Sequence, residues 1–200
     1  MITIHDVEQG SDEWLKLRDQ LYTGSNADKL LLHNGKTKVV NGVVSKYSLT
    51  EITGFKGNFY TKRGHALEEE AVEIYEAHTG RTVARPGFIT NSKYPVCGYS
   101  PDGIDGDTLL EVKAFNDIKH DVINKDNIPL KILAQIIFGL VISEKTDAFL
   151  LLYNPRFAKK FLDDVENPHY NPRNAFKMIE VKASRDALIN MRKILREASL

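Results

Sequence analysis

The sequence has a single cysteine and no excess of either charge sign. Because Cys97 stands alone among 200 residues, an internal disulfide, an all-cysteine zinc site and an iron–sulfur cluster are excluded, and the chain suits a reducing compartment. Lys and Arg number 27, as do Asp and Glu, so the large positive excess that marks many nucleic-acid-binding proteins is missing. Any phosphate-binding surface must therefore be local.

The sequence also lacks a long hydrophobic run and a basic leader. The longest apolar run, residues 136–142, is far shorter than the about 20 residues that cross a bilayer, and residues 1–6 show no basic region followed by an apolar stretch. Repeats and low-complexity segments are missing too, and the glycines and prolines are scattered rather than gathered into a linker. We expect one soluble domain over residues 1–200, in the cytoplasm and without a membrane partner.

Helix and strand signals alternate along the chain. Helix-capping residues and apolar residues at helical spacing predict helices over residues 11–21, 25–32, 63–78, 130–142 and 184–199, with Ser11, Ser25 and Ser184 as N-caps. Short apolar runs between turn residues predict strands over 86–90, 96–100, 109–113, 148–153 and 176–181, the first three as a meander. Valines around Asn41-Gly42 predict a small hairpin or mobile flap. The pattern favours a mixed α/β sheet with helices on both faces.

The segment most informative about chemistry is residues 99–113. Pro101 and Gly103 flank Asp102 and predict a turn that projects its carboxylate. The tripeptide Glu111-Val112-Lys113 has the alternation of a strand, so its two charged side chains share one face, with backbones about 6.6 Å apart. The tight acidic turn between the two motifs brings Asp102 back beside Glu111, so three charged groups meet in one site.

These groups match the needs of phosphodiester hydrolysis. The carboxylates of Asp102 and Glu111 and the carbonyl of Val112 are hard oxygen ligands suited to Mg²⁺ or Mn²⁺. An adjacent lysine, here Lys113, can orient or deprotonate water or stabilise a pentacovalent phosphate. A Glu-x-Lys strand taken by itself is more often a solvated edge, because charged residues are mostly on surfaces.

The chain carries a second copy of this tripeptide. Glu180-Val181-Lys182 has no Pro-Asp-Gly turn close upstream and runs directly into the last predicted helix. We therefore assign the second copy to the surface and the first to the site.

Glu68 is a candidate for a third carboxylate. At 100° per residue it lies within the apolar arc of its helix, between Tyr75 and Val72. An inward carboxylate needs a cation or a donor, so Glu68 either belongs to the metal site or forms a buried salt bridge to Arg63 or another base. The opposite face is a solvated stripe of Glu69, Glu73 and Glu76.

Gln135 is the polar residue of the apolar run over residues 132–138. A buried amide must be hydrogen-bonded. Gln135 is therefore either a polar anchor of the core or a residue that points into the site.

A set of motifs runs in order along nearly the whole chain: residues 7–18, Thr23-Gly24-Ser25, Arg63-Gly64 to Glu68, Ser100-Pro101-Asp102-Gly103, Glu111-Val112-Lys113, Ala134-Gln135 and residues 153–156. This ordered set resembles the lambda-type phage recombination exonucleases, also called the YqaJ-like viral recombinase nucleases, of the PD-(D/E)xK superfamily. The resemblance implies a restriction-endonuclease-like fold, with a mixed β-sheet core flanked by helices on both faces.

The resemblance also implies roles for individual residues. Asp102, Glu111 and the Val112 carbonyl would bind catalytic Mg²⁺, for which Mn²⁺ is a possible substitute. Glu68 and Lys113 would complete the catalytic set, with Lys113 acting on the attacking water, and Gln135 is a further candidate for that set.

A second implied group binds the 5′-terminal phosphate. It consists of Arg18, Ser25 and Ser100. An arginine fork pairs with phosphate oxygens, and Ser25 at a helix start would place backbone N–H groups where an anion is favoured. Without the resemblance, an ordinary surface arginine and an ordinary N-cap would explain Arg18 and Ser25.

The function implied by the resemblance is degradation of one strand of linear duplex DNA from its phosphorylated 5′ end, which leaves a 3′ single strand for a single-strand annealing protein. Some members are trimeric rings that thread the DNA, and a ring would need basic groups only along its channel. Two alternatives stay open: an endonuclease of restriction or junction-resolving type, and a catalytically silent DNA-end-binding subunit. For residues 33–60 we carry over no strand-separating role.

Overall fold

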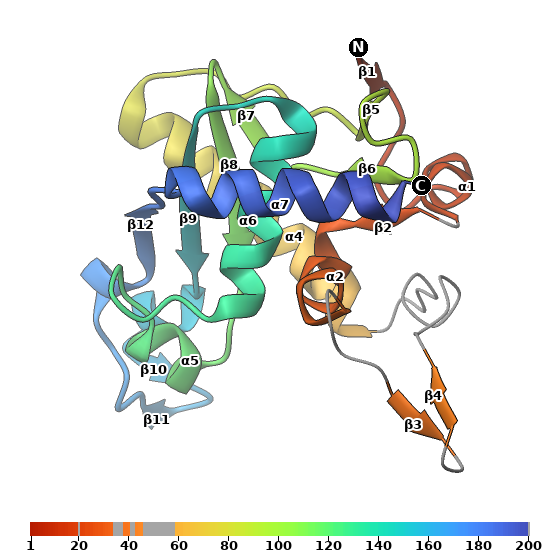
Figure 1. The fold of residues 1–200 in the computed structure, drawn as a ribbon. Coiled ribbons are helices and arrows are strands. Elements are labelled where there is room, and N and C mark those ends of the chain that lie inside the picture. Colours follow the sequence, from red (N-terminus) through yellow and green to blue (C-terminus); the bar gives the residue numbers. More distant parts are fainter. Residues whose placement is uncertain (20, 34–37, 41–42, 46–58, 200) are drawn as a thin grey trace.

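The computed structural model describes residues 1–19, 21–33, 38–40, 43–45 and 59–199. Its centre is a pair of four-stranded sheets that lie side by side (Figure 1). None of the helices in these ranges is long and apolar enough to span a membrane.

The first sheet has the strand order β1-β5-β6-β2. Its strands β1 and β5 and strands β5 and β6 pair antiparallel, whereas β6 and β2 are parallel. The bounds are β1 (Ile2–His5), β2 (Tyr22–Thr23), β5 (Phe88–Asn91) and β6 (Cys97–Tyr99).

The second sheet has the order β12-β9-β8-β7 and is also mixed. Its central strands β8 and β9 are parallel, and the two outer pairs are antiparallel. The bounds are β7 (Gly103–Asp105), β8 (Thr108–Lys113), β9 (Asp147–Tyr153) and β12 (Phe176–Glu180).

The predicted meander over residues 86–113 is confirmed for its first two runs, which pair antiparallel, and is wrong for the third. Its first two runs became β5 and β6 of the first sheet, and its third became β8 of the second sheet. Pro101 lacks a backbone N–H and follows β6 closely, so it favours the end of pairing there. The chain then forms β7, a strand of three residues that the sequence analysis did not predict, and returns as β8.

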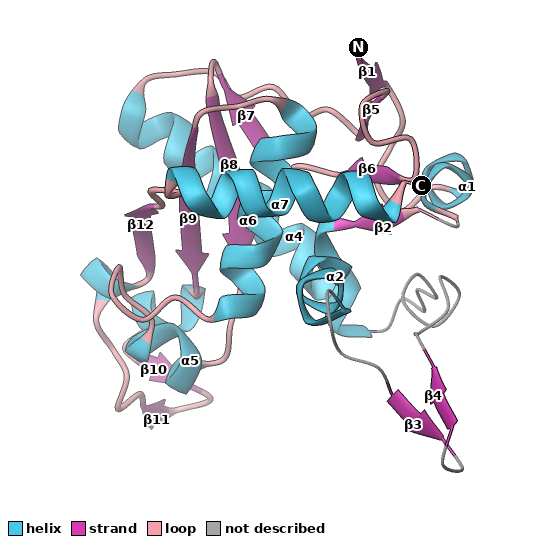
Figure 2. Ribbon diagram, in the orientation of Figure 1, coloured by secondary structure: helices cyan, strands magenta, loops and turns pink. Residues whose placement is uncertain are grey.

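Helices cover both faces of the second sheet, as predicted (Figure 2). Leu109 belongs to the buried cluster that includes α6 (Leu130–Ser143) and α7 (Arg185–Ala198). Leu110 and Val112 belong to the cluster on α4 (Phe59–Thr79). Because side chains alternate between faces of a strand, odd-numbered residues of β8, Glu111 included, lie on the α6 face.

The predicted helices are present, with different ends. Helix α1 (Asp12–Arg18) is capped by Ser11, whose side chain accepts from the Trp14 N–H, and it stops at Arg18 because the backbone of Asp19 (φ −59°, ψ 130°) is no longer helical. The predicted N-cap at Ser25 is wrong, since Ser25 lies inside the short helix η1 (Gly24–Asn26), which leads into α2 (Ala27–His33). In the first turn of α2, Asp28 Oδ1 is buried and makes no hydrogen bond to a described residue.

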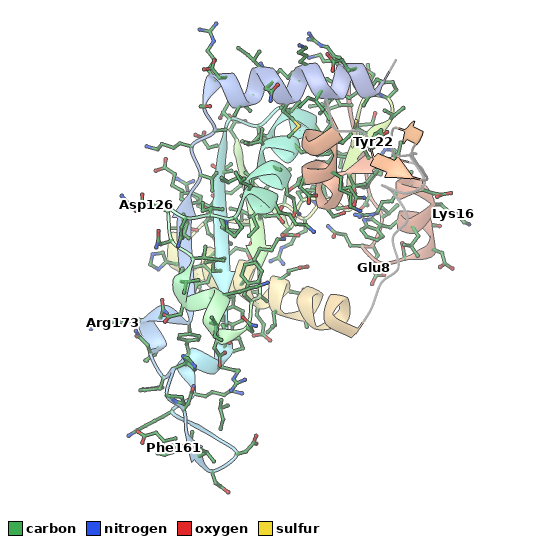
Figure 3. All side chains as sticks on the ribbon, turned by 60° about the horizontal axis from the view of Figure 1, so that its bottom comes forward. Glu8, Lys16, Tyr22, Asp126, Phe161 and Arg173 are labelled. Carbon is green, nitrogen blue, oxygen red and sulfur yellow. The ribbon has the colours of Figure 1, made fainter. Side chains whose placement is uncertain are left out.

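The remaining elements are small. The hairpin predicted around Asn41-Gly42 is confirmed by the pairing of β3 (Lys38–Val40) with β4 (Val43–Ser45); its turn lies outside the described residues, and so does most of the expected flap. A second hairpin projects from the body of the molecule and carries the exposed Phe161 (Figure 3). The others are α5 (Asp117–Val122), η2 (Pro155–Ala158), β10 (Phe161–Leu162), β11 (Val165–Glu166) and η3 (Pro172–Asn174).

Candidate functional site

The β7–β8 hairpin brings the predicted acidic residues together. Gly103 pairs with Leu110, which places Asp102 next to the end of β8. The backbone N–H of Val112 donates to Asp102 Oδ2 at 2.6 Å. The turn therefore returns Asp102 to Glu111-Val112-Lys113, as the sequence predicted.

Glu111 is fully buried and is held from two sides. Its Oε2 accepts from the Tyr99 hydroxyl at 2.7 Å, and its Oε1 accepts from the Lys113 ammonium. Lys113 Nζ also donates to the Val112 carbonyl at 3.0 Å. The predicted shared face of Glu111 and Lys113 is thus confirmed, and the contact with Tyr99 is one that the sequence analysis did not foresee.

The electrostatics of this cluster are dominated by crowded negative charge. Burial, then the charges of Glu111 and Glu68, hold the pKa of Asp102 well above its ordinary value. Burial alone would lower the pKa of Lys113, but the charges of Glu111 and Asp102 outweigh it and raise that pKa. The cluster therefore favours a proton or another cation among its carboxylates.

Glu68 faces this cluster from α4. It is half-buried, and its charge raises the pKa values of both Asp102 and Lys113. The alternative partner, the Arg63 side chain, lies outside the described part of the chain. On the opposite face Glu69 and Glu73 are exposed as predicted.

Glu76 departs from the predicted solvated stripe. It is half-buried, and its carboxylate accepts from the Val83 N–H at 2.7 Å and pairs with Arg85 at 3.2 Å. The chain that follows α4 folds back over this position, which helical phase alone does not reveal.

The predicted phosphate-binding residues also meet. Arg18 Nη1 lies 3.4 Å from Ser100 Oγ, and Arg18 Nη2 lies 3.4 Å from Ser25 Oγ. Thr23 joins them: its hydroxyl lies 3.0 Å from that of Ser25 and 3.5 Å from Arg18 Nη2. The three predicted residues therefore form one hydrogen-bonded polar group with Thr23 as an additional member. We call this group of four side chains the Arg18 pocket.

Trp14 fixes the geometry of the Arg18 pocket. Its indole ring packs under the Arg18 guanidinium, 4.1 Å from ring centroid to Cζ, and its Nε1 donates to Ser100 Oγ at 2.8 Å. Trp14 and Arg18 are four residues apart on α1, a spacing that places both on one helix face. Burial lowers the pKa of Arg18 to about 10. An anion bound beside the guanidinium would offset the cost of burying the positive charge of Arg18.

Gln135 lies on α6 beside the same pocket. A Cβ placed on Gly24, the residue before Ser25, would be 3.2 Å from Gln135 Cγ. Gln135 is half-buried, so it borders η1 instead of being sealed inside the core.

The second Glu-x-Lys copy is a surface feature, as predicted. The side chains of Glu180 and Lys182 are 57% and 81% exposed and pair with each other at 3.5 Å. The first copy differs in the feature that matters for chemistry, because its glutamate side chain is 1% exposed.

The donors around Asp102 fit a hard divalent cation. They are carboxylate oxygens and a strand carbonyl, and the raised pKa of Asp102 reports the same crowding that a cation would relieve. Among the described residues, no three His, Cys, Asp or Glu side chains are gathered as a preformed metal cage. Mg²⁺ commonly keeps several waters and uses one or two carboxylates plus substrate oxygens, so such a cage is not required.

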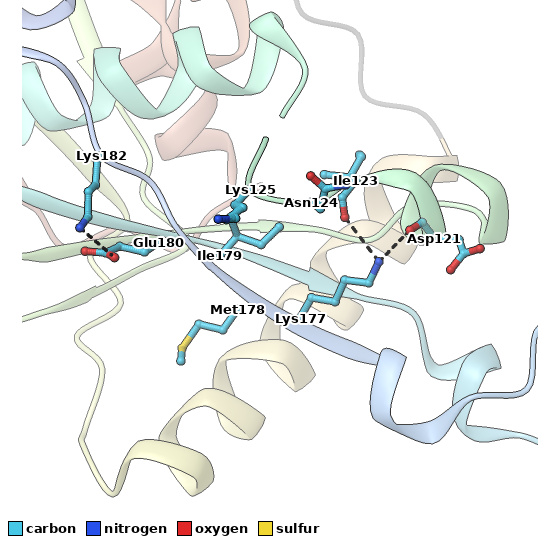
Figure 4. Close-up of a pocket in the computed structure, with 9 residues that line it drawn as sticks. All are labelled: Asp121, Ile123, Asn124, Lys125, Lys177, Met178, Ile179, Glu180 and Lys182. Atoms are coloured by element: carbon cyan, nitrogen blue, oxygen red, sulfur yellow. Dashed lines mark hydrogen bonds and ion pairs between the residues drawn. The ribbon is translucent and has the colours of Figure 1, made fainter. Parts of the chain in front are cut away.

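A pocket lies elsewhere on the molecule, away from these residues. It measures about 800 Å³ and lies along β12 and the 121–125 segment (Figure 4). Its Lys177 donates to the carbonyls of His120 and Asp121 at 2.6 and 3.0 Å. It contains no residue of the Asp102 cluster or the Arg18 pocket, so we do not assign the chemistry to it.

Comparisons with known proteins agree with this fold. A sequence profile described as the YqaJ-like viral recombinase domain matches residues 13–146, whereas no curated protein matches significantly. An alkaline exonuclease from Laribacter hongkongensis, LHK-Exo, has 22% identity and a TM-score of 0.67 over 94% of this chain and 90% of its own. Its structure in complex with dAMP gives 19%, 0.68 and the same coverage. A phage-related exonuclease from Haemophilus somnus 129PT has 14% identity and a TM-score of 0.56, with 90% and 91% covered.

Proposed function

Because this chain belongs to the YqaJ-like viral recombinase family, we propose that it is a Mg²⁺-dependent exonuclease that degrades one strand of linear duplex DNA from the 5′ end and leaves 3′ single strands. Family membership supports a nuclease that acts on DNA in recombination. We further propose the 5′→3′ direction of degradation, Mg²⁺ as the metal ion and 3′ single strands as the product.

One observation carries the direction: the Arg18 pocket and the acidic cluster share a tripeptide. Ser100 belongs to the pocket and Asp102 to the cluster, with Pro101 between them. Two residues of chain span at most about 7 Å, which is roughly the spacing of neighbouring phosphates along a DNA strand. A terminal phosphate bound by Arg18, Ser25 and Ser100 would place the next phosphodiester at the acidic cluster.

The residues that would hold the metal are Asp102, Glu111 and the Val112 carbonyl, with Glu68 beside them. A divalent ion at such a site polarises a phosphodiester oxygen and lowers the pKa of water, and Mn²⁺ would substitute for Mg²⁺. Lys113 lies against both Glu111 and the Val112 carbonyl, in position to orient the attacking water. Gln135 would contact the terminal nucleotide from the other side of η1.

Membership in the family also suggests where the protein acts, how its copies assemble and which partner receives its product. We propose that residues 1–200 are one catalytic domain in the cytoplasm of a bacterial host, and that copies assemble into a trimeric ring around linear duplex DNA. Its 3′ single-stranded product would pass to a single-strand annealing protein. The structure of LHK-Exo with dAMP agrees with a nucleotide-binding site in this fold.

The test compares DNA with and without ends. We expect linear duplex to be reduced to mononucleotides in Mg²⁺ but not in chelator, while covalently closed circles stay intact. Nicking of circles would instead identify an endonuclease of restriction or junction-resolving type. A silent end-binding subunit would bind linear ends without hydrolysis, and loss of hydrolysis in Asp102→Ala would exclude contaminating nuclease.

A further inference from the structure

Tyr99 lies between the two halves of the site, the acidic cluster and the Arg18 pocket. It is the last residue of β6 in the first sheet, whereas Glu111 belongs to β8 in the second sheet. The hydrogen bond from its hydroxyl to Glu111 Oε2, 2.7 Å long, therefore ties the two sheets together at the acidic cluster. Both side chains are buried, with 1% and 0% of each residue exposed.

The Tyr99 hydroxyl fixes which oxygen of the Glu111 carboxylate is left for contacts with the rest of the acidic cluster. Tyr99 donates to Oε2, and Oε1 accepts from the Lys113 ammonium, which also donates to the Val112 carbonyl. The two oxygens of Glu111 are thus held by different partners, and the Asp102 carboxylate accepts from the N–H of the same Val112. Without the hydroxyl, Oε2 would be left buried without that donor, which is costly enough to favour another rotamer.

The tyrosine ring is itself confined by two glycines. A Cβ on Gly24 of η1 would lie 2.7 Å from Tyr99 Cε2, and a Cβ on Gly139 of α6 would lie 2.6 Å from Tyr99 Cζ. Real Cβ atoms do not approach a ring so closely, so only glycine fits on either side. The ring thus fills the gap between α6 and the turn that carries Ser25.

We propose, on the basis of the function proposed above, that Tyr99 is a positioning residue that presents Glu111 to the divalent metal and couples that metal site to the Arg18 pocket through its contact with Gly24. A displacement of η1 when a terminal phosphate binds would move the ring and, through the hydroxyl, the Glu111 carboxylate. By reciprocity, metal binding and end binding would favour each other.

The test measures Mn²⁺ binding directly, from the electron paramagnetic resonance signal of free Mn²⁺, without DNA. The proteins are the wild type, Tyr99→Phe, Gly24→Ala and Tyr75→Phe. The last is a matched control, because the Tyr75 hydroxyl makes a similar bond of 2.8 Å to Asp105, at the far end of β7. Thermal unfolding of each protein checks that it is folded.

Loss of one hydrogen bond to a charged group predicts about tenfold weaker Mn²⁺ binding for Tyr99→Phe. Gly24→Ala retains the hydroxyl but displaces the ring, so its Mn²⁺ binding should also weaken, while Tyr75→Phe binds as the wild type does. Equal affinity in a folded Tyr99→Phe protein would overturn the positioning role while leaving the nuclease proposal intact. A wild type that neither binds Mn²⁺ nor cuts DNA would overturn both.

The coupling is tested with duplexes that carry a 5′-phosphate or a 5′-hydroxyl. In the wild type, the phosphorylated duplex should tighten Mn²⁺ binding more than the hydroxyl duplex does, and this difference should shrink in Gly24→Ala. Identical Mn²⁺ binding with the two duplexes in the wild type would contradict the coupling.

Discussion

The contacts of Lys113 indicate a role in catalysis more directly than those of any other residue in the site. Its ammonium contacts the buried Glu111 and the carbonyl that would bind the metal. Lys113→Ala should reduce turnover at least about 100-fold, the usual scale for loss of a group that moves a proton. Binding of duplex ends, measured in Ca²⁺ to prevent cutting, should change little.

The second Glu-Val-Lys copy supplies the control. Lys182 is 81% exposed, and Lys182→Ala should cut DNA at the wild-type rate. Turnover of Lys113→Ala near that of Lys182→Ala would remove Lys113 from the site.

Arg18 makes a prediction about substrate preference. Its guanidinium lies against the hydroxyls of Ser25 and Ser100, and an arginine fork matches phosphate oxygens. Arg18→Ala should therefore lose most of the preference for 5′-phosphorylated over 5′-hydroxyl duplex, measured as the ratio of initial rates. Arg81, an exposed arginine paired with Asp105 at 3.1 Å, is the matched control. An unchanged ratio in Arg18→Ala would separate Arg18 from the terminal phosphate.

At this scale the sequence predicts the charged residues better than their partners. Asp102 beside Glu111-Val112-Lys113 follows from a turn and a strand, and the meeting of Arg18 with Ser25 and Ser100 follows from the family resemblance. Tyr99 carries no such signal, because its role depends on a contact between two sheets. Thr23 lies in the motif Thr23-Gly24-Ser25, but its place beside Ser25 depends on the path of η1.

At the scale of elements, local signals predict helices well. Ser184 caps α7, accepting from the Ala187 N–H at 3.1 Å. Ser184→Ala should lower the free energy of unfolding by about 1 kcal/mol, measured by urea denaturation, without changing DNA cleavage. Ser199→Ala removes a hydroxyl at the other end of the helix and should lower the free energy of unfolding by less. A larger loss for Ser199→Ala would contradict the capping role of Ser184.

Strand partners are harder to predict than strands. The runs predicted over 86–90, 96–100 and 109–113 overlap the strands β5, β6 and β8. The first two pair with each other as expected, but the parallel partner of β8 is decided by contacts far along the chain. Strand β8 lies parallel to β9, with Glu111 opposite Leu150, and no periodicity in residues 109–113 encodes that choice. Strand β7 and helix α5, with three and six residues, are too short for a periodic signal.

For the whole molecule, pH and metal binding should be linked through Asp102. Its raised pKa means that the folded protein keeps a proton that the unfolded chain has already released. The metal-free protein therefore loses stability as pH rises through the interval between the ordinary and the raised pKa, and a bound cation would replace the proton. Apparent Mg²⁺ affinity should rise with pH across that interval.

The protein is titrated with Mg²⁺ at several pH values, and the rise in its thermal unfolding temperature reports Mg²⁺ binding. Asp102→Asn, which has no proton to release, should show little stabilisation by Mg²⁺ at any of them. A wild-type Mg²⁺ affinity independent of pH would contradict the linkage.

Assembly is a second property of the whole molecule. A net charge of zero is compatible with a ring whose basic groups line only the channel. We expect light scattering to give the molar mass of three chains. A monomer that still degrades DNA processively would contradict the ring.

The central claim is hydrolysis that begins at a 5′ end. The most direct measurement follows a linear duplex that carries different labels at the 5′ and 3′ ends of one strand, with a phosphate on that 5′ end. We expect that in Mg²⁺ the 5′ label is released first, as a mononucleotide, and that the 3′ label stays on long DNA until late in the digestion. Early release of the 3′ label, or cutting inside the duplex before either end, would contradict it.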